Sequence, residues 1–363
     1  MTHDNTIIME MVRSSLFAFY ITAGIYCLII NKKKLTYKYL LSTILFIWGL
    51  ELFKDAVSQQ FGWFTEIRVR DIYLLSDLLV IPLCAMFVLT MLYKKYITPK
   101  IFLQHVLPFI ICPIIYATTG FRFIYFIGLA FPVAYGIIVI PKIFRGIKRY
   151  ELAIVNNYSY QENINVRWLR TVVILLALTL VFCIYTYTNV SCLLFYLYYA
   201  YCALTWIYII FMTERLERPK WSPEAVIVPA DTAALKEEAL EKITTMTAPV
   251  SAGWNMKLQN CFEKEELFLN QNLTMQDVAI KIGTNRTYLS IYLNKKLHTT
   301  FYDYVNSYRL KYAENMLTSC NDKIIDISQK SGFNNLSTFT SYFKKKNGCT
   351  PKEFRNRYRA NNY

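Results

Sequence analysis

The feature of this sequence that most constrains its fold is a series of long apolar stretches in the first two-thirds. A helix needs about 20 mostly apolar residues to cross a bilayer, because its backbone groups must be hydrogen-bonded within the segment where no water reaches. Seven stretches meet or approach this length, at residues 14–30, 37–53, 72–93, 101–118, 123–140, 169–187 and 192–212. Seven in series, with short connectors, predict a transmembrane bundle rather than the buried helices of a soluble domain. A charged fraction of only 18% agrees with this.

The basic residues between these stretches predict how the bundle is oriented. Cytoplasmic loops of membrane proteins retain Lys and Arg, and alternate connectors carry sixteen such residues on one side and five on the other. The N-terminus is therefore expected outside the cell and everything after Met212 in the cytosol, which requires an odd number of spans. The first stretch lacks the basic start and cleavage pattern of a signal peptide, so we expect it to be a span.

Three ionisable residues stand out because a charged group within a bilayer is costly and tends to be functional. Asp77 lies early in the third stretch, Glu51 near the end of the second and His105 early in the fourth. They predict a polar pocket or a proton-sensitive pair that takes part in sensing. For Asp77 the alternative is a structural hydrogen bond to a neighbouring Ser, Thr or Tyr.

Cysteine and histidine usage argues against metal and catalytic sites. The nine cysteines form no CxxC pair, and six of them fall inside apolar stretches, where small core residues are expected. The chain has three histidines and no Gly-rich nucleotide-binding stretch. We therefore expect no metal, no cofactor and no enzymatic activity.

Net charge divides the chain into three parts. Residues 1–213 carry 18 Lys and Arg against 9 Asp and Glu (+9), residues 214–256 carry 5 against 7 (−2), and residues 257–363 carry 17 against 9 (+8). We expect a membrane domain, a cytosolic linker and a basic domain suited to an anionic partner. Within the linker, residues 233–246 predict a helix that either pairs with a second copy of the chain, giving a homodimer, or packs on the last domain.

The last part of the chain repeats one spacing twice. In the first copy Thr274 precedes an apolar-periodic segment at 275–281, with Asp277 as its capping-box partner, and Gly283 precedes a helix expected at 285–296. In the second copy the segment 322–329 is followed by Gly332 and a helix expected at 335–346. Each copy has the order of a helix-turn-helix unit, in which the second helix enters the major groove of DNA.

Residues 301–318 lie between the two copies and predict an amphipathic helix of about 27 Å at 1.5 Å per residue. Such a helix can hold two recognition helices close to one DNA turn apart, about 34 Å. The expected fold is therefore all-α: a seven-helix transmembrane bundle followed by a cytosolic domain with two helix-turn-helix units joined by a long helix.

Two segments of the last part, YVNSYRLKYAENML at 304–317 and IIDISQKSGFNNLSTFTSYFKKKNGCTPKEFRNRYR at 324–359, resemble the DNA-binding domain of the AraC/XylS family of bacterial transcription regulators. The positions that carry the resemblance are Arg309, Ala313, Gly332, Phe333, Phe339, Phe343, Lys344, Gly348, Pro351, Phe354 and Arg355. The first unit departs from the family pattern, because Leu297 and His298 stand where a glycine usually ends the recognition helix. Either His298 adopts a left-handed conformation at some cost or the helix ends differently.

Carried over by position, the resemblance implies two sets of DNA contacts. Base contacts are expected from the recognition helices, through Arg286, Thr287, Ser290 and Ile291 in the first, and Asn335, Leu336, Ser337, Thr338 and Ser341 in the second. Phosphate contacts are expected from Lys295, Lys296, Lys344, Lys345, Lys346, Arg355, Arg357 and Arg359. Core positions are expected at Leu289, Leu293, Phe339 and Phe343.

These features predict a membrane-embedded one-component transcription regulator of the bacterial cytoplasmic membrane. Its expected partners are double-stranded DNA, the lipid bilayer and a small-molecule or membrane-derived signal. One alternative is a transporter or intramembrane enzyme that carries a DNA-binding tail. The other is a regulator that the apolar helices only tether.

Overall fold

The computed structural model describes residues 3–63, 66–93, 96–188, 191–216 and 248–361. Within these ranges the chain is helical and has no strand, apart from one isolated antiparallel bridge between Tyr158 and Thr274. The expected all-α class is therefore confirmed for the described residues. The contacts divide the chain into two compact units, Met1–Lys148 with Val166–Leu216 and Arg149–Asn165 with Glu217–Tyr363.

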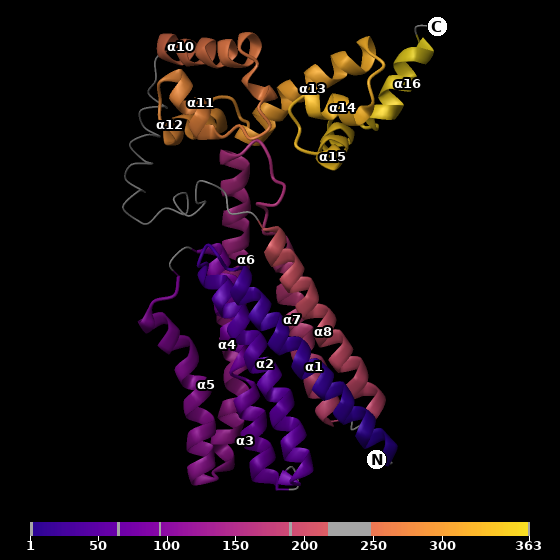
Figure 1. The fold of residues 1–363 in the computed structure, drawn as a ribbon. Helices are drawn as coiled ribbons and strands as arrows, with labels where there is room; N and C mark the ends of the chain where they lie inside the picture. Colours follow the sequence, from indigo (N-terminus) through magenta and orange to yellow (C-terminus); the bar gives the residue numbers. More distant parts are fainter. Residues whose placement is uncertain (1–2, 64–65, 94–95, 189–190, 217–247, 362–363) are drawn as a thin grey trace. The chain divides into compact units, whose positions relative to one another are not determined.

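Long helices build the first unit (indigo to red in Figure 1). In chain order they are α1 His3–Ile30, α2 Thr36–Gln60, α3 Ile67–Asp77, α4 Val80–Leu92, α5 Pro99–Thr119, α6 Arg122–Asn157, α7 Trp168–Thr188 and α8 Cys192–Arg215. Helix α2 contacts both α1 and α4, α1 also contacts α8, and α7 contacts α8. Helix α6 continues past its apolar stretch, and its residues from Arg149 onward belong to the second unit.

The helices of the first unit expose large apolar side chains. Phe123, Ile137 and Ile138 of α6 are each at least 70% exposed, and Ile29 of α1 is 71% exposed. Exposed apolar area of this extent is rare on soluble monomers and marks contact with lipid or with other apolar surfaces. Six helical segments of the described chain are long and apolar enough to cross a membrane: Ile7–Ile30, Ile67–Leu92, Pro99–Thr119, Arg122–Asn157, Trp168–Thr186 and Leu193–Arg215.

Helix α2, the second of the seven expected spans, is not among these six. It has 25 residues, but it extends beyond the expected end at residue 53 and carries Glu51, Lys54 and Asp55 near its end. Its contacts with α1 and α4 bury much of its length, including Leu41, Ile44 and Leu45. A helix covered by neighbours needs a less apolar surface than one that faces lipid, so a count of seven spans remains a prediction.

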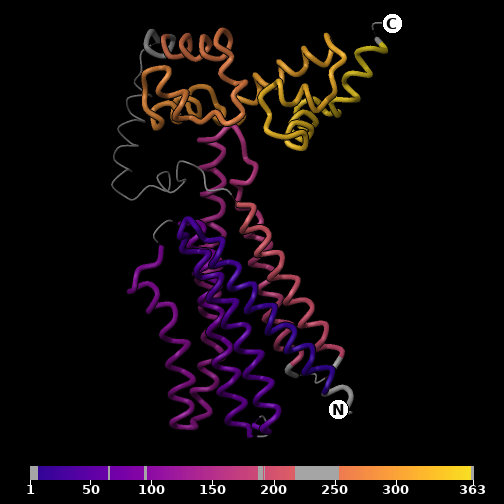
Figure 2. The backbone as a smooth tube through the Cα atoms, in the orientation of Figure 1, coloured from indigo at the N-terminus to yellow at the C-terminus, as the bar shows by residue number. Residues whose placement is uncertain are grey.

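The second unit combines the segment Arg149–Asn165 with the helices of the C-terminal region. These are α10 Ala248–Gln259, α11 Met275–Ile282, α12 Arg286–Lys295, α13 Phe301–Ser319, α14 Ile324–Lys330, α15 Leu336–Asn347 and α16 Pro351–Asn361, with a 3-10 turn at Leu267–Leu269. The tube in Figure 2 shows α13 running between α10 to α12 and α14 to α16. The helix expected at 233–246 lies outside the described residues.

Two separate hydrophobic cores stabilise the C-terminal region. The first lies among α10, α11, α12 and the start of α13 and includes Phe262, Val278 and Leu289. The second lies among the end of α13, α14 and α15 and includes Phe339 and Phe343. The four core positions expected from the sequence are each at most 1% exposed, which confirms that prediction. Helix α13 contributes to both cores and therefore joins the two halves.

Local sequence signals fix where these helices begin and end. The capping box predicted for α11 is present, since Asp277 N–H donates to Thr274 Oγ1 and Thr274 N–H donates to the Asp277 carboxylate. Gly283 ends α11 at φ +75°, a left-handed conformation that glycine adopts without steric cost. His298 follows α12 at φ +50°. The left-handed conformation considered for His298 is therefore present.

Candidate nucleic-acid interface

Helix α12 is the first candidate recognition helix, and it is partly covered. Asn285 caps its start by accepting a hydrogen bond from Tyr288 N–H at 2.9 Å. Thr287 and Ser290 are half-buried. Ile291 is only 7% exposed, so it packs in the protein and is not available to a base.

Arg286 begins α12 and is half-buried rather than free in solution. Burial lowers the pKa of its guanidinium to about 10, against an electrostatic interaction with Tyr158 that raises the pKa. Tyr158 follows directly after α6, 128 positions before Arg286 in the sequence. Periodicity and motif spacing within the last hundred residues gave no signal for this neighbour, because it comes from between two apolar stretches.

Helix α15 is the second candidate recognition helix, and its outward face is open. Leu336, Ser337 and Ser341 are exposed, while Thr338 is half-buried. Asn335 caps the helix, because its Oδ1 accepts a hydrogen bond from Thr338 N–H at 2.8 Å. The structure therefore shows that Asn335 stabilises the start of α15. The base contact predicted for Asn335 from the sequence stays a prediction.

The basic residues expected at phosphates differ in how free they are. Lys295, Lys296, Lys344, Lys345, Lys346 and Arg357 are exposed. The Lys346 ammonium lies 5.6 Å from the centre of the Tyr342 ring, at the end of α15. Arg355 is half-buried, and its Nη2 donates to the Asp322 carbonyl at 2.7 Å. Arg359 donates to the Asn321 side chain. Five exposed lysines thus form the most accessible basic set: Lys295 and Lys296 at the end of α12, and Lys344, Lys345 and Lys346 in the last turn of α15.

Arg309, in the middle of α13, is the most heavily bonded side chain of the C-terminal region. It is 1% exposed, and burial lowers the pKa of its guanidinium to about 10. Its Nε donates to the Phe268 carbonyl at 2.7 Å and its Nη2 to the Asn270 carbonyl at 2.7 Å. The sequence had marked Arg309 only through the family resemblance, without a role.

The turn before α15 lies directly beside this guanidinium. Gly332 has φ +85°, and a Cβ built there would lie 2.5 Å from the Phe268 carbonyl oxygen and 3.1 Å from Arg309 Nε. The Arg309 guanidinium also lies over the Phe333 ring, 5.9 Å from its centre. One residue therefore contacts the loop before α11 and the turn before α15.

The charged and titratable residues of the apolar stretches that were predicted to take part in sensing fall into two separate groups. Lys54 pairs with Asp77 and Glu51, and its Nζ lies 3.9 Å from Asp55. Lys54 was missed as a partner because the sequence reading ended the second span at residue 53, although its spacing of three from Glu51 on a longer helix would have placed the two on one face.

His105 lies apart from these carboxylates in its own aromatic group. Its ring nitrogens are within hydrogen-bond distance of Tyr96 Oη at 3.1 Å and Tyr135 Oη at 2.5 Å. The described contacts of His105 are thus with Tyr96 and Tyr135 and not with Asp77 or Glu51, which the sequence had grouped with it.

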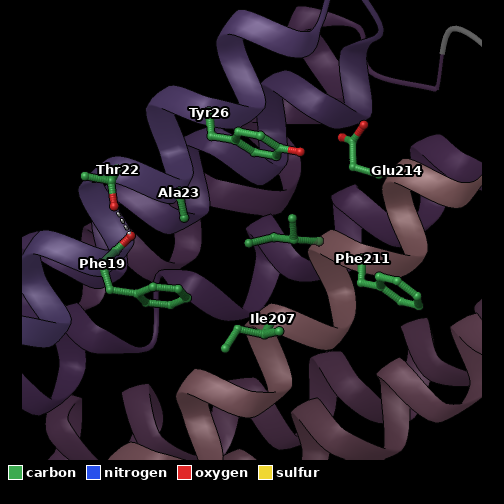
Figure 3. Close-up of a pocket in the computed structure, with 8 residues that line it drawn as sticks. Phe19, Thr22, Ala23, Tyr26, Ile207, Phe211 and Glu214 are labelled. Carbon is green, nitrogen blue, oxygen red and sulfur yellow. Dashed lines mark hydrogen bonds between the residues drawn. The ribbon is translucent and has the colours of Figure 1, made fainter.

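A groove between α1 and α8 provides a further feature of the first unit (Figure 3). It is lined by Phe19, Thr22, Ala23, Tyr26, Ile207, Ile210, Phe211 and Glu214. Glu214 is the charged member, and its carboxylate lies 2.7 Å from Lys38 Nζ. Among the described residues no cluster of His, Cys, Asp and Glu is suited to hold a metal ion.

The C-terminal region is similar in sequence to known helix-turn-helix proteins. A family model described as a helix-turn-helix domain matches residues 271–357. The HTH-type transcriptional regulator YtdP of Bacillus subtilis is 28% identical over 127 residues, which is 35% of this chain and 16% of that protein. The HTH-type transcriptional regulator YkgA of Escherichia coli is 28% identical over 100 residues, which is 28% of this chain and 42% of that protein. The chain thus spans less than half the length of these relatives.

Two crystal structures are similar to the same region. The C-terminal domain of the two-component response regulator YesN from Fusobacterium nucleatum is 29% identical and covers 28% of this chain and 98% of its own, with a TM-score of 0.26. A transcriptional regulator with an AraC-type DNA-binding domain from Chromobacterium violaceum is 26% identical and covers 30% of this chain and 96% of its own, with a TM-score of 0.27.

These relatives are regulators rather than enzymes, in agreement with the expectation from the sequence. The family match lies over α11 to α16, the helices that carry the five exposed lysines of the expected phosphate set, the second hydrophobic core and most of the first. The resemblance in the sequence is therefore confirmed at the level of the domain: residues 271–357 match a helix-turn-helix domain, and the proteins similar to this region are HTH-type transcriptional regulators.

Proposed function

We propose that this protein is a membrane-embedded one-component transcription regulator with three parts, a sensor domain at 1–213, a linker at 214–256 and a DNA-binding domain at 257–363. The observation that carries the proposal is the helix-turn-helix match at residues 271–357 in a chain whose preceding helices are long and outwardly apolar. The two cores joined by α13 support two helix-turn-helix units, α11 with α12 and α14 with α15.

DNA is read mainly by the open face of α15. Leu336 suits a thymine methyl group, and the Ser337 and Ser341 hydroxyls donate to or accept from base edges, with Thr338 beside them and Asn335 holding the first turn. Thr287 and Ser290 of α12 contribute in the same way, and Arg286, at the start of the helix, can make a bidentate contact with guanine. The exposed lysines and Arg357 bind phosphates, with Arg355 at the edge of the set.

The first part of the chain spans the bacterial cytoplasmic membrane seven times, with the N-terminus outside and the DNA-binding domain in the cytosol. The distribution of Lys and Arg in the sequence supports this orientation. Signal sensing involves the ion-pair group of Lys54, Glu51, Asp55 and Asp77, with His105 as a separate polar site. A charged group that is costly in a bilayer, paired by one lysine, responds to any ligand or proton that alters the pairing.

Selection of duplexes from a random pool tests the DNA-reading part. The full chain in lipid nanodiscs is expected to enrich one motif with two recognised parts about 10 base pairs apart. The triple variant Leu336→Ala, Ser337→Ala, Ser341→Ala is expected to lose the enrichment of one part only. Lack of any enriched motif would contradict sequence-specific binding.

A promoter reporter in cells tests the sensing part. Lys54→Met or Asp77→Asn is expected to shift reporter output, because the first leaves the three carboxylates without their lysine and the second removes one of the carboxylates that Lys54 pairs with. Phe123→Leu, at a side chain that is 74% exposed, serves as the control and is expected to leave output unchanged. Equal output from all variants, at equal protein levels, would favour a helix bundle that only tethers the DNA-binding domain.

A further inference from the structure

The segment between α6 and α7 packs with the DNA-binding domain rather than with the helices that flank it. Residues Arg149–Asn165 belong to the same compact unit as the C-terminal region. Within this stretch we call residues 158–165 the α6–α7 segment. Tyr158 and Ser159 are each 1% exposed, and Ile164 is equally buried. Burial of a polar loop leaves its backbone N–H and C=O groups without water, so such a loop is stable in a buried position only where other groups hydrogen-bond to it.

Ser159 uses all its hydrogen-bonding groups on the C-terminal region. Its backbone N–H and its hydroxyl both donate to the Leu273 carbonyl, at 3.2 and 2.8 Å. Its carbonyl accepts from Arg309 Nη1 at 2.9 Å and from Asn306 Nδ2 at 3.4 Å. Its hydroxyl oxygen accepts from Arg309 Nη2 at 3.1 Å. Asn306 and Arg309 are both 1% exposed, so Ser159 fills a closed polar notch on α13.

The neighbouring residues extend this contact toward the first recognition helix. Tyr158 forms the antiparallel bridge with Thr274, the residue that caps α11. The Tyr158 phenol also interacts electrostatically with Arg286 at the start of α12, and the Glu162 carboxylate interacts with Arg309. The α6–α7 segment therefore interacts with both helices of the first helix-turn-helix unit, α11 and α12, and with the Arg309 guanidinium at the centre of α13.

Arg309 connects the α6–α7 segment to the second helix-turn-helix unit, α14 with α15, as well. The same guanidinium that holds Ser159 also holds the Phe268 and Asn270 carbonyls and lies beside Gly332 in the turn before α15. Since α6 is a continuous helix from Arg122 to Asn157, it joins its apolar part in sequence to Ser159, two residues beyond its end. The apolar part of α6 is thus connected through the backbone to Ser159, which binds in the buried notch formed by Asn306 and Arg309.

We propose that the α6–α7 segment is an intramolecular inhibitor that docks in the Arg309–Asn306 notch and keeps Arg286 from the DNA, so that undocking is the event which a signal favours. The proposal rests on the proposed function, because it names how the membrane part controls DNA binding. Arg286 is half-buried in the docked chain, whereas base contact requires the guanidinium to be free to reach the major groove.

The test compares variants of the full chain in lipid nanodiscs by two measurements. Ser159→Leu puts a bulky side chain in the closed notch and is expected to undock the segment without altering any residue of the DNA-binding domain. Ser159→Ala removes only the hydroxyl contacts and is expected to act in the same direction with a smaller effect. Leu152→Ala changes a side chain of the same stretch that is 55% exposed and serves as the matched control.

The first measurement is hydrogen exchange of backbone amides. Wild type and Leu152→Ala are expected to protect the Ser159 amide, which donates to Leu273, while Ser159→Leu exchanges it rapidly. The second is the affinity for a random-sequence duplex pool of about four helical turns, roughly 40 base pairs. If about nine in ten wild-type chains are docked, undocking tightens apparent binding about tenfold.

The outcomes separate this inference from the proposed function. Rapid exchange at Ser159 in the wild-type chain would overturn docking, whatever the DNA affinity is. Loss of protection in Ser159→Leu with unchanged or weaker DNA binding would overturn inhibition while leaving the regulator itself intact. A chain that binds no duplex in any variant would overturn the proposed function and, with it, the control that depends on it.

Discussion

The two halves of the DNA-binding domain have the same order of helices but differ in how free their recognition helices are. In the first half, α12 starts at a half-buried Arg286, whose pKa Tyr158 raises electrostatically, and ends at Lys295, with His298 at φ +50° three residues further on. In the second half, α15 exposes Leu336, Ser337 and Ser341 and ends at Gly348, which adopts φ +72° without strain.

This difference indicates a division of tasks within one domain. The half that contacts the α6–α7 segment is the half whose DNA-reading surface is partly covered, and the half far along α13 keeps an open one. A regulator built in this way binds DNA tightly only when the segment has left the domain and both units engage the duplex. Each of the following predictions tests whether the two halves differ as the structure indicates.

The largest effect is expected from Arg309→Leu, because Arg309 donates hydrogen bonds to the loop before α11 and also lies beside Gly332 and the Phe333 ring in the turn before α15. The change removes five hydrogen bonds and leaves the buried Phe268 carbonyl and the partly buried Asn270 carbonyl without this donor. We expect the free energy of unfolding of the domain to fall by about 3–5 kcal/mol. Urea-dependent proteolysis of the full chain in nanodiscs measures it, with the exposed Lys311→Ala on the same helix as control. A loss confined to one half would contradict the role of Arg309 in both.

The turn glycines provide the next largest contrast. Gly332→Ala meets both a left-handed backbone and a carbonyl oxygen 2.5 Å from the new Cβ, whereas Gly283→Ala, at φ +75°, has nothing within 4 Å. We expect a loss of about 3 kcal/mol for Gly332→Ala and about 1 kcal/mol for Gly283→Ala. The same proteolysis assay compares them. Equal losses would mean that backbone strain alone decides and that the second turn is not packed against the first half.

The sequence predicted the features that depend on local periodicity and failed where distant segments meet. The capping box at Thr274 follows from residues within a few positions, the core position Phe339 followed from the family resemblance, and the left-handed His298 was one of the two conformations that the sequence left open. Ser159 carried no signal, because its partners lie 114 or more positions away. Lys54 was missed for a different reason: the predicted span ended one residue too early, so an ion-pair partner was counted as a loop charge.

The salt dependence of DNA binding distinguishes the basic residues of the two halves. If Lys344, Lys345 and Lys346 each neutralise one phosphate, their replacement by Ala lowers the slope of log affinity against log salt by about 2.7. Lys295→Ala with Lys296→Ala is expected to lower it by less than about 1.8, because the first half engages DNA only after undocking. Fluorescence anisotropy with the full chain at several salt concentrations measures both slopes. A larger change from the α12 pair would reverse the order of the two halves.

The smallest effects are expected at the helix caps, where the two halves are built alike. Asn285 caps α12 and Asn335 caps α15, each through an Oδ1 that accepts from the backbone N–H three residues on. Replacing either by Ala should lower the free energy of unfolding by about 1 kcal/mol, whereas Ser, which also caps, should cost only a few tenths.

DNA binding then separates the two roles that Asn335 is able to play. As a cap, Asn335→Ala weakens binding to all duplexes evenly, because the first turn of α15 frays, and Asn335→Ser leaves both affinity and sequence preference as in wild type. Selection from the random pool with the Ser variant measures this directly. If Asn335→Ser kept the stability but changed the preference at one base pair, the amide would be reading a base, and α15 would recognise DNA one residue earlier than its exposed face indicates.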